Sequence, residues 1–330
     1  MKALFMTSSI KKIDEVYTEE TRKALAESLE FLDPVTSADQ LSRPDLADAE
    51  VIFSTWGMLP LTKEQLAAHL PKLKAVFYGA GSVQYFARPF IESGVQVFSA
   101  WAANAVPVAE YTVAQIILAN KGYFQRFHHL PGEPWSNRSF GGYYTGNFES
   151  KIGLIGIGMI GSLVAQMLKS YNLEILAFDP FLPDEKAAEL GIVKVPLETL
   201  FSECTVISNH LANNPQTVGM LNGSLFRLMK PNATFINTGR GAQVVEDDLI
   251  AALEAEPARV ALLDVTMPEP PKPDSKFYTL PNVFLSPHIA GSLGDEVARM
   301  GDYMAEEFAR FINGEPTKWN VTLKMLETMA

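Results

Sequence analysis

The segment Lys151 to Gly161, with the sequence KIGLIGIGMIG, restricts what this chain can fold into more than any other stretch. A short apolar run leads directly into Gly156, Gly158 and Gly161, and an amphipathic pattern with helical spacing follows. In this GxGxxG spacing, the first glycine permits a tight strand-to-helix turn, the second lets the backbone approach a pyrophosphate, and the third allows close packing of helix on strand. The helix N-terminus adds free N–H donors. The segment therefore predicts a βαβ unit that binds a dinucleotide.

An acidic residue at the end of the next predicted strand strengthens this interpretation. A GxGxxG pattern alone also occurs in ordinary glycine-rich turns, so it needs support from its surroundings. The run Leu173 to Phe178 is followed by Asp179, near the spacing of about 20 residues at which a carboxylate accepts both ribose hydroxyls. That carboxylate would repel a 2′-phosphate, and Pro180, Phe181 and Leu182 offer no cation for one. We therefore expect NAD rather than NADP.

Short β-type runs alternate with amphipathic stretches along the rest of the chain, a pattern typical of parallel α/β domains. In the first hundred residues, we predict strands and helices at Lys2 to Met6, Glu19 to Phe31 (helix), Val51 to Ser54, Thr62 to Leu70 (helix), Lys74 to Tyr78 and Val95 to Phe98. A longer helix follows over Asn104 to Lys121. The alternation resumes at Lys151 to Gly156, Met159 to Leu168, Leu173 to Phe178, Cys204 to Ser208, Ala233 to Asn237, Asp247 to Leu253, Val260 to Leu263 and Val283 to Leu285.

Two segments stand apart from this alternation. The final predicted helix, Asp295 to Asn313, has one apolar face and Gly314 where a helix-ending glycine belongs. The segment Gly122 to Ser150 contains glycines, prolines and aromatic residues without a period, which predicts a loop. Because it is longer than most connections and rich in aromatic side chains, we expect an ordered arm that packs on a second subunit.

Composition narrows the partners and the compartment. The chain has 330 residues and a net charge of −11, which argues against nucleic acid or an anionic membrane as the main partner. The single Cys204 cannot form an intramolecular disulfide, and the N-terminus lacks the apolar region of a secretory signal. The longest charge-free apolar stretch, Ile152 to Leu168, is too short to read as membrane-spanning. We expect a cytoplasmic protein with no transmembrane segment and no metal site.

Three further segments follow predicted strands, where open α/β sheets place their ligands: Asn237 to Gly241 (NTGRG), Asp264 to Pro270 (DVTMPEP) and Ser286 to Gly291 (SPHIAG). With the glycine motif, they give the chain a sequence that resembles the D-isomer-specific 2-hydroxyacid dehydrogenase family, whose members include glycerate, phosphoglycerate, lactate and formate dehydrogenases. The resemblance runs over most of the chain and is most specific from Lys151 to Gly291.

The resemblance implies three catalytic residues: Arg240, Glu269 and His288. Each residue type suits the reaction. Hydride addition to a ketone creates an alkoxide that needs a proton, and histidine exchanges protons near neutral pH. A neighbouring carboxylate such as Glu269 would favour the imidazolium form, and the forked guanidinium of Arg240 suits a substrate carboxylate. Taken singly, each residue type more often has an ordinary structural role: a hydrogen bond for histidine, a solvated salt bridge for arginine and a loop position for a glutamate between prolines.

The resemblance also implies binding residues. Those expected to contact NAD are Gly156, Gly158, Met159, Ile160, Gly161, Asp179, His210, Leu211, Thr238, Gly239 and Asp264. Those expected to bind the substrate, besides Arg240, are Gly79, Ala80, Gly81 and Ser82, whose backbone N–H groups would form an anion-binding nest. A plain turn at this glycine-rich segment, and a turn or capping role for Asp264, remain alternative interpretations.

For the fold, the resemblance implies an α/β protein with two doubly wound parallel sheets and the active site in the interdomain cleft. A flavodoxin-like substrate-binding domain would comprise residues 1–102 and 293–330, and a Rossmann NAD-binding domain residues 103–292, with the arm at 122–150. The predicted partners are a small anionic 2-keto or 2-hydroxy acid and a second copy of the chain, forming a homodimer through the NAD-binding domain. Nucleic acid and membranes are not predicted partners.

Departures from the family pattern leave the substrate open. Met159 stands where a basic residue is common, Tyr78 likewise, and Gln84 and Tyr85 replace a usual Asp-Asn pair. We hypothesise that Tyr78 and Trp56 lie beside the substrate pocket. Two alternative functions use the same fold: an NAD(H)-sensing corepressor or scaffold that does not turn substrate over, and a dehydrogenase acting on formate or phosphite.

Overall fold

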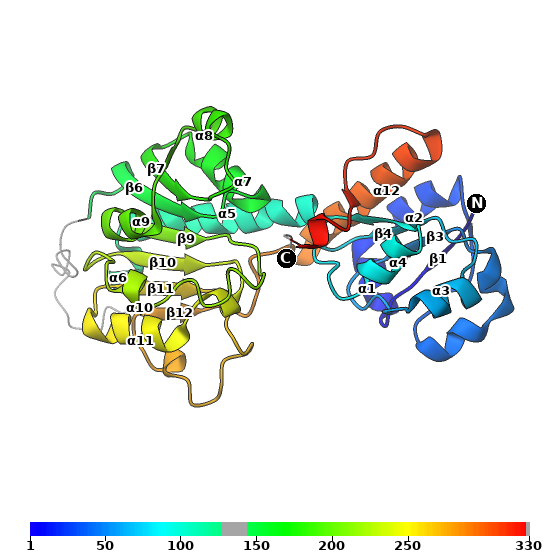
Figure 1. The fold of residues 1–330 in the computed structure, drawn as a ribbon, viewed down its shortest axis with the longest axis horizontal. Helices are drawn as coiled ribbons and strands as arrows, with labels where there is room; N and C mark the ends of the chain where they lie inside the picture. The colour runs from blue at the N-terminus through cyan, green and yellow to red at the C-terminus, as the bar shows by residue number, and fades with distance from the viewer. Residues whose placement is uncertain (127–143, 328–330) are drawn as a thin grey trace. The chain divides into compact units, whose positions relative to one another are not determined.

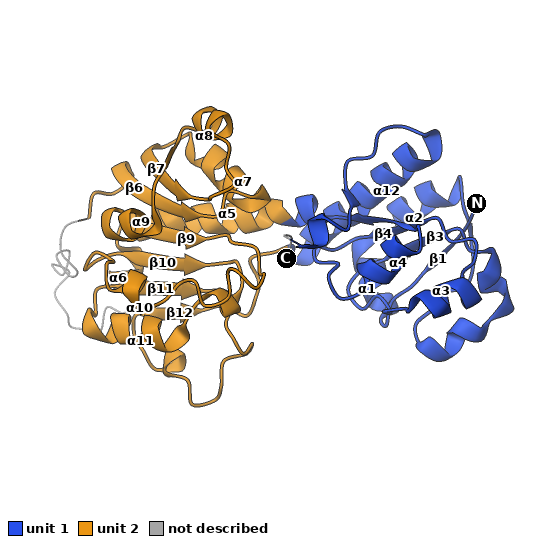
Figure 2. Ribbon diagram, in the orientation of Figure 1, with its two compact units in different colours: residues 1–104, 292–330 blue, residues 105–291 orange. Residues whose placement is uncertain are grey.

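The computed structural model describes residues 1–126 and 144–327. The chain divides into two compact units, of which unit 1 comprises Met1–Asn104 and Ser292–Ala330 and unit 2 comprises Ala105–Gly291 (Figure 2). Unit 1 is therefore discontinuous in sequence, with unit 2 inserted between its parts. The sequence predicts these boundaries at 102/103 and 292/293.

Unit 1 is built on a six-stranded sheet in the order β13-β5-β4-β3-β1-β2, the flavodoxin-like order. Strands β1 to β5 run parallel to one another, and β13 pairs antiparallel with β5. Their bounds are β1 Lys2–Phe5, β2 Glu30–Phe31, β3 Val51–Ser54, β4 Ala75–Tyr78, β5 Gln96–Ser99 and β13 Asn320–Val321. The helices that accompany them are α1 Ile10–Val16, α2 Glu19–Ala26, α3 Lys63–His69, α4 Ala87–Glu92 and α12 Ala298–Asn313 (Figure 1).

The C-terminal helix α12 completes the core of unit 1. Its apolar face buries Met300, Met304 and Phe308 against the sheet, where the Phe308 ring meets the rings of Phe53 and Phe77 at 5.5 and 5.6 Å. The helix ends at Gly314 in the left-handed conformation, φ 68°, as the sequence predicts. Because rings of this size each bury well over 100 Å² of apolar surface, this contact explains why the last residues belong with the first hundred.

One predicted helix is too long. The sequence predicts a helix over Glu19 to Phe31, whereas α2 ends at Ala26 and the chain turns into the edge strand β2. Phe31 pairs with Ala3 of β1, and its ring stacks on that of Phe5 at 4.9 Å. Stacking of these two partly buried rings stabilises the strand more than helix propensity stabilises another turn, so tertiary packing overrides the local pattern.

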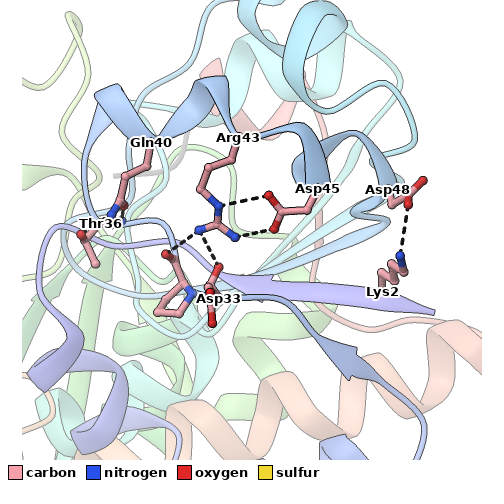
Figure 3. Close-up of polar contacts among 8 residues, drawn as sticks. Lys2, Asp33, Thr36, Gln40, Arg43, Asp45 and Asp48 are labelled. Atoms are coloured by element: carbon pink, nitrogen blue, oxygen red, sulfur yellow. Dashed lines mark hydrogen bonds and ion pairs between the residues drawn. The ribbon is translucent and has the colours of Figure 1, made fainter.

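The connection from β2 to β3 contains two 3₁₀ turns fixed by Arg43 (Figure 3). Its guanidinium forms a two-point ion pair with Asp45 and also donates to the carbonyl oxygens of Asp33 and Pro34, at 3.1 and 3.2 Å. Lys2 pairs with Asp48 across the same surface at 3.1 Å. These exposed contacts order a loop that lacks a regular helix, and they have no catalytic chemistry.

Unit 2 is built on a seven-stranded, wholly parallel sheet in the order β12-β11-β10-β9-β6-β7-β8, the Rossmann order with one added strand. The strands are β6 Phe148–Ile155, β7 Asn172–Phe178, β8 Ile192–Lys194, β9 Val206–Asn209, β10 Thr234–Asn237, β11 Val260–Leu263 and β12 Val283–Leu285. The helices are α5 Trp101–Asn120, α6 Tyr123–Arg126, α7 Met159–Leu168, α8 Asp184–Leu190, α9 Leu197–Glu203, α10 Gly223–Phe226 and α11 Glu246–Ala255 (Figure 1). The prediction of two doubly wound sheets is confirmed.

The helix α5 begins in unit 1 and continues into unit 2. By length and composition alone it could cross a membrane, but half of an apolar stretch of 18 residues within it is buried inside the protein. Ala109, Ile116 and Ala119 pack into the core of unit 2 beside Ile152 and Leu154. Its apolar character is that of a core helix.

The segment predicted as a loop over Gly122 to Ser150 is only partly a loop. It contains the helical turn α6, and β6 begins at Phe148. Phe124 of this turn packs against Phe284 with ring centroids 5.3 Å apart, which fixes α6 on the sheet of unit 2. The rest of the predicted arm, residues 127–143, lies outside the described residues.

Cys204, the single cysteine, lies in the core of unit 2 against Leu200 and Phe201. Burial raises the pKa of its thiol to about 12. Because the thiolate is the reactive form, we expect Cys204 to react with a disulfide reagent at pH 8 at least about 100-fold more slowly in the native protein than in 6 M guanidinium chloride. Comparable rates in the two conditions would contradict the placement of this side chain.

Candidate functional site

The glycine turn after β6 has the geometry that its sequence predicts. Gly156 adopts φ 86°, and a Cβ there would lie 2.9 Å from the backbone of His210. A Cβ on Gly161 would lie 2.1 Å from the carbonyl oxygen of Gly156, so only glycine permits this approach of α7 to the strand. At Gly158 a Cβ would meet nothing within 4 Å, so this backbone faces open space at the start of α7. The turn therefore leaves room for a phosphate group beside a helix N-terminus.

Asp179 stands opposite this turn, directly after β7. Its carboxylate accepts hydrogen bonds from the N–H groups of Ile157 and Phe181, both at 2.8 Å. The first bond fixes Asp179 to the glycine turn, and the second orients it at the strand end. Met159 and Ile160 begin α7 beside it, and the Met159 side chain is exposed. A ribose with free hydroxyls, as in NAD, fits next to this carboxylate.

His210 and Leu211 follow β9 and adjoin the glycine turn, as predicted. The His210 ring is buried, and its Nε2 lies 3.0 Å from the hydroxyl of Ser208. Burial lowers the pKa of His210 to about 4. The ring is therefore neutral near pH 7 and cannot supply a positive charge to a bound phosphate.

This shift in the pKa of His210 predicts an acid-dependent loss of stability. The folded pKa lies below the unfolded value of about 6.5, so the unfolded chain takes up the proton first, and stability falls as the pH drops from about 6.5 toward about 4. We expect wild type to lose about 2 kcal/mol more unfolding free energy than His210→Gln between pH 7 and pH 5, measured by urea denaturation. Equal losses in the two proteins would contradict the assignment.

Two predicted catalytic residues, Glu269 and His288, are hydrogen-bonded to each other. The His288 Nδ1 lies 2.7 Å from the Glu269 Oε1, and both side chains are about half exposed. His288 adopts φ 54°, a left-handed conformation that is unusual for a non-glycine residue. Such a conformation persists when its surroundings hold it in place, and it is common at functional sites.

Asp264, at the end of β11, holds the turn that carries His288. Its buried carboxylate accepts from the hydroxyl of Ser286 at 2.6 Å and from the N–H groups of Ile289 and Ala290 at 2.9 Å each. Its carbonyl oxygen accepts from the His288 N–H at 3.0 Å. These bonds define the turn from both sides of His288, so Asp264 positions the histidine whatever contact it makes with NAD.

Arg240 follows β10 and approaches the Glu269 segment from the neighbouring strand end. Gly241 lies so close to Thr266 that a Cβ there would be 2.0 Å from the Thr266 carbonyl carbon. This contact brings the NTGRG and DVTMPEP segments together. Burial lowers the pKa of Arg240, and the charge of Glu269 opposes that shift, so the carboxylate acts on a guanidinium that stays charged. One Nη of Arg240 donates to the Gly239 carbonyl at 2.8 Å.

Thr238 and Gly239 connect this segment to its surroundings. The Thr238 hydroxyl lies 3.3 Å from that of Thr112 on α5, and the Gly239 N–H donates to the Asn237 side chain at 3.1 Å. The strand ends of unit 2 thus gather the predicted catalytic residues and the predicted NAD-binding residues on one edge of the sheet, the edge formed by the carboxyl ends of its strands.

The remaining predicted residues, Gly79 to Ser82, follow β4 in unit 1. The Thr55 hydroxyl donates to the Gly79 carbonyl at 2.8 Å, and the Ser99 hydroxyl donates to the carbonyls of Ala80 and Gly81 at 2.9 and 2.6 Å. With these carbonyls turned toward the protein, the N–H groups of Gly81 and Ser82 have no hydrogen-bond partner among residues 1–126 and 144–327. Free N–H groups of this kind suit an anion.

The sequence profile described as "D-isomer specific 2-hydroxyacid dehydrogenase, NAD binding domain" matches residues 113–290, more than half of the chain. The chain belongs to the D-isomer specific 2-hydroxyacid dehydrogenase family. Within this family, the matched region is the NAD-binding domain, and it covers all of β6 to β12. NAD is the cofactor of this domain, and the open glycine turn and Asp179 fit it.

Several curated proteins are similar to this family member. D-3-phosphoglycerate dehydrogenase of Archaeoglobus fulgidus is 30% identical over 236 residues, which is 72% of this chain and 44% of the relative. That of Mycobacterium bovis is 31% identical over 252 residues, 76% of this chain and 47% of the relative. The chain spans less than half the length of these relatives.

Solved structures share the fold. A phosphoglycerate oxidoreductase from Rhizobium etli superposes with a TM-score of 0.79 and 23% identity, over 99% of both chains. D-lactate dehydrogenase with NAD⁺ from Lactobacillus jensenii gives a TM-score of 0.74 and 23% identity, over 98% of this chain and 100% of that one. Identities at this level support the architecture of this dehydrogenase family member and carry no substrate assignment.

The hypothesis that Tyr78 and Trp56 lie beside the substrate pocket has a different outcome for each residue. The Tyr78 side chain is 2% exposed and packs on Phe86 with ring centroids 5.0 Å apart, so it belongs to the core of unit 1. Its role as a pocket-lining residue is therefore wrong, because β4 directs this ring inward. Trp56 is 37% exposed, with the Lys12 ammonium 5.6 Å from its ring centroid, and it remains a candidate for substrate contact.

Two positioning residues of the family member carry no signal in the sequence. The buried Tyr17 hydroxyl donates to the carbonyls of Ser54 and Phe77, at 3.1 and 2.9 Å, beneath the glycine-rich segment that starts at Gly79. Tyr111 of α5 lies 2.9 Å from the Ser286 hydroxyl, which in turn donates to Asp264. The sequence predicts no site role for either tyrosine, and the fold places each beside a predicted site residue.

Proposed function

We propose that this protein transfers a hydride between NAD(H) and a small 2-keto or 2-hydroxy acid. The observation that carries the proposal is the His288–Glu269 pair at 2.7 Å, on the same sheet edge as Arg240 and the glycine turn. In a fold that binds NAD, a proton donor paired with a carboxylate and accompanied by a partly buried guanidinium suits carbonyl reduction.

In this proposal, NADH supplies the hydride that reduces the ketone carbon. His288 donates a proton from its Nε2 to the carbonyl oxygen as negative charge develops there, and it takes the proton back in the reverse direction. Glu269 orients the ring through its hydrogen bond with Nδ1. Arg240 binds the carboxylate next to the carbonyl with its forked N–H donors, which orients the ketone for attack.

The free N–H groups of Gly81 and Ser82 serve as an anion-binding element in this proposal. The Thr55 and Ser99 hydroxyls fix their orientation before ligand binds, so little conformational entropy is lost on binding. A carboxylate is the anion that the proposed substrates share. Net negative charge over the chain as a whole does not oppose this, because the N–H groups and Arg240 act locally.

One assay tests the proposal. Purified protein is incubated with NADH and a panel of 2-keto acids of increasing side-chain size, and nicotinamide absorbance is followed, with His288→Ala as the control for contaminating activity. Oxidation of NADH by wild type and not by the variant supports the proposal. Binding of NADH without turnover of any acid would favour the sensing or scaffold alternative. NAD⁺ reduction by formate or phosphite alone would favour a dehydrogenase acting on those anions.

The family resemblance also leads us to propose a homodimer formed through the NAD-binding domain, and a cytoplasmic location. A single buried, unreactive cysteine suits a reducing compartment. Light scattering at micromolar concentration tests the dimer: a mass of about twice 36.3 kDa supports it, and a mass near 36.3 kDa argues against it.

A further inference from the structure

Three buried carboxamide side chains lie beneath the predicted active site: Asn209 at the end of β9, Asn237 at the end of β10 and Gln243 just beyond Arg240. All three are at most 1% exposed. The Asn209 Nδ2 donates to the Asn237 Oδ1 at 3.0 Å and to the Gln243 Oε1 at 2.6 Å. Buried amides destabilise the fold unless their hydrogen bonds are made, so these three side chains form one hydrogen-bonded cluster.

Gln243 connects two functional segments through the two ends of its amide. Its Oε1 accepts from the backbone N–H of Arg240 at 3.2 Å, and its Nε2 donates to the backbone carbonyl of Leu211 at 2.7 Å. Arg240 belongs to the proposed substrate site, and Leu211 belongs to the predicted NAD-binding segment after β9. One side chain therefore spans the substrate segment and the cofactor segment.

The neighbouring amides complete both segments. The Asn237 Nδ2 donates to the Arg240 carbonyl at 3.2 Å, and the Asn209 Oδ1 accepts from the Leu211 N–H at 3.2 Å. Side chains of this cluster thus hold the backbone of Arg240 at both its N–H and its C=O, and they hold the backbone of Leu211 in the same way. Loops held in this way lose little freedom on binding.

The donors and acceptors determine the orientation of the Gln243 amide. If the amide were flipped, its NH₂ would face the N–H donors of Asn209 and Arg240, and its oxygen would face the Leu211 carbonyl. Gly239 must also be glycine, because a Cβ there would lie 2.9 Å from the Gln243 Oε1 and 3.0 Å from the Asn209 Nδ2. The space and the polarity around Gln243 are therefore specific to this carboxamide.

We propose that Gln243 is a positioning residue that couples the NAD-binding segment at Leu211 to the substrate-binding Arg240. NAD bound against Leu211 would depend on the same Gln243 amide that holds the Arg240 backbone, so the geometry of the cofactor segment fixes that of the substrate segment. The role given to Arg240 in this inference rests on the proposed function. The hydrogen bond from Gln243 to the cofactor segment at Leu211 does not.

The test compares Gln243→Met, which removes the oxygen and the NH₂ of the amide at similar volume, with a matched control elsewhere in unit 2. Asn282 is a buried carboxamide that donates to the carbonyls of Leu253 and Arg259, at 3.1 and 2.8 Å, and it takes no part in the proposed site. Asn282→Leu therefore measures the cost of losing a buried amide in general. Melting temperature, NADH affinity by fluorescence titration, and KM and kcat for a reactive 2-keto acid are measured for each.

For Gln243→Met we expect NADH affinity to fall and KM for the keto acid to rise, each on the order of tenfold, with kcat changed less than about threefold. Asn282→Leu should lower the melting temperature by a comparable amount and leave both binding constants unchanged. Wild-type values for the Met variant, or equal changes in the control, would overturn the coupling.

Gln243→Glu separates the two ends of the amide, and it decides the question if the Met variant does not fold. It keeps an oxygen toward Arg240 and Asn209 but replaces the donor to Leu211. NADH affinity should therefore fall about tenfold with a smaller change in KM; equal changes in both would overturn the proposal. If wild type binds NADH but turns over no keto acid, the proposed function fails, and the NADH titrations of the variants still judge the contact with Leu211.

Discussion

Replacing His288 by alanine is expected to lower kcat for keto-acid reduction by about 10²- to 10⁴-fold, with NADH affinity within about twofold of wild type. The reason is that the variant loses the group that delivers the proton, while the glycine turn and Asp179 stay in place. Stopped-flow measurement of hydride transfer and fluorescence titration of NADH check the two halves of this expectation.

Glu269→Gln is the matched variant for this prediction. It preserves shape and a hydrogen bond to the His288 Nδ1, but it removes the negative charge beside the ring. We expect a smaller fall in kcat than in His288→Ala, measured in the same stopped-flow assay. If His288→Ala weakened NADH binding as much as it slowed hydride transfer, the histidine would be structural rather than catalytic.

Replacing Arg240 is the second change with a large expected effect. Arg240→Ala should reduce kcat/KM for keto acids by at least about 100-fold, because a charged, two-point contact with the substrate carboxylate is worth about 3 kcal/mol. Most of the loss should appear in KM, since the guanidinium binds a carboxylate that carries the same charge throughout the reaction. Steady-state kinetics and NADH titration measure the effect.

Arg240→Lys distinguishes charge from geometry. Lysine keeps the positive charge but lacks the planar fork, so we expect it to recover only part of the lost affinity. Because burial already disfavours a cation at this position, the more strongly hydrated ammonium should bind less well than the guanidinium. Full activity of the lysine variant would mean that Arg240 supplies charge alone, and unchanged activity of the alanine variant would remove it from the site.

The nucleotide turn could be predicted from sequence because its requirements are local. Gly156 and Gly161 are each needed for a backbone approach within one strand–turn–helix unit, and spacing along the chain expresses this directly. The family resemblance implies Glu269 and His288 as catalytic residues, but their pairing depends on a turn fixed by Asp264 and on the left-handed backbone of His288. No periodicity in the sequence expresses contacts of that kind.

The predictions that failed did so where tertiary packing decides. The pattern from Glu19 to Phe31 continues a helix, yet the stacking of Phe31 on Phe5 makes its end an edge strand. The resemblance places Tyr78 beside the substrate because it stands where a basic residue is common in the family, and its ring instead faces the core. Gln243 carries no signal in the sequence, because a glutamine near a motif resembles an ordinary polar residue and its two amide partners are set by the fold.

The burial of Cys204 makes the natural chain a convenient background for site-specific labelling. With its one thiol buried and inert, one exposed cysteine introduced in each unit would provide the two sites that maleimide dyes modify. A donor dye in unit 1 and an acceptor dye in unit 2 would then report, by energy transfer, whether NAD changes the distance between the units. The wild-type cysteine need not be removed first, so the catalytic variants above can be followed in the same way.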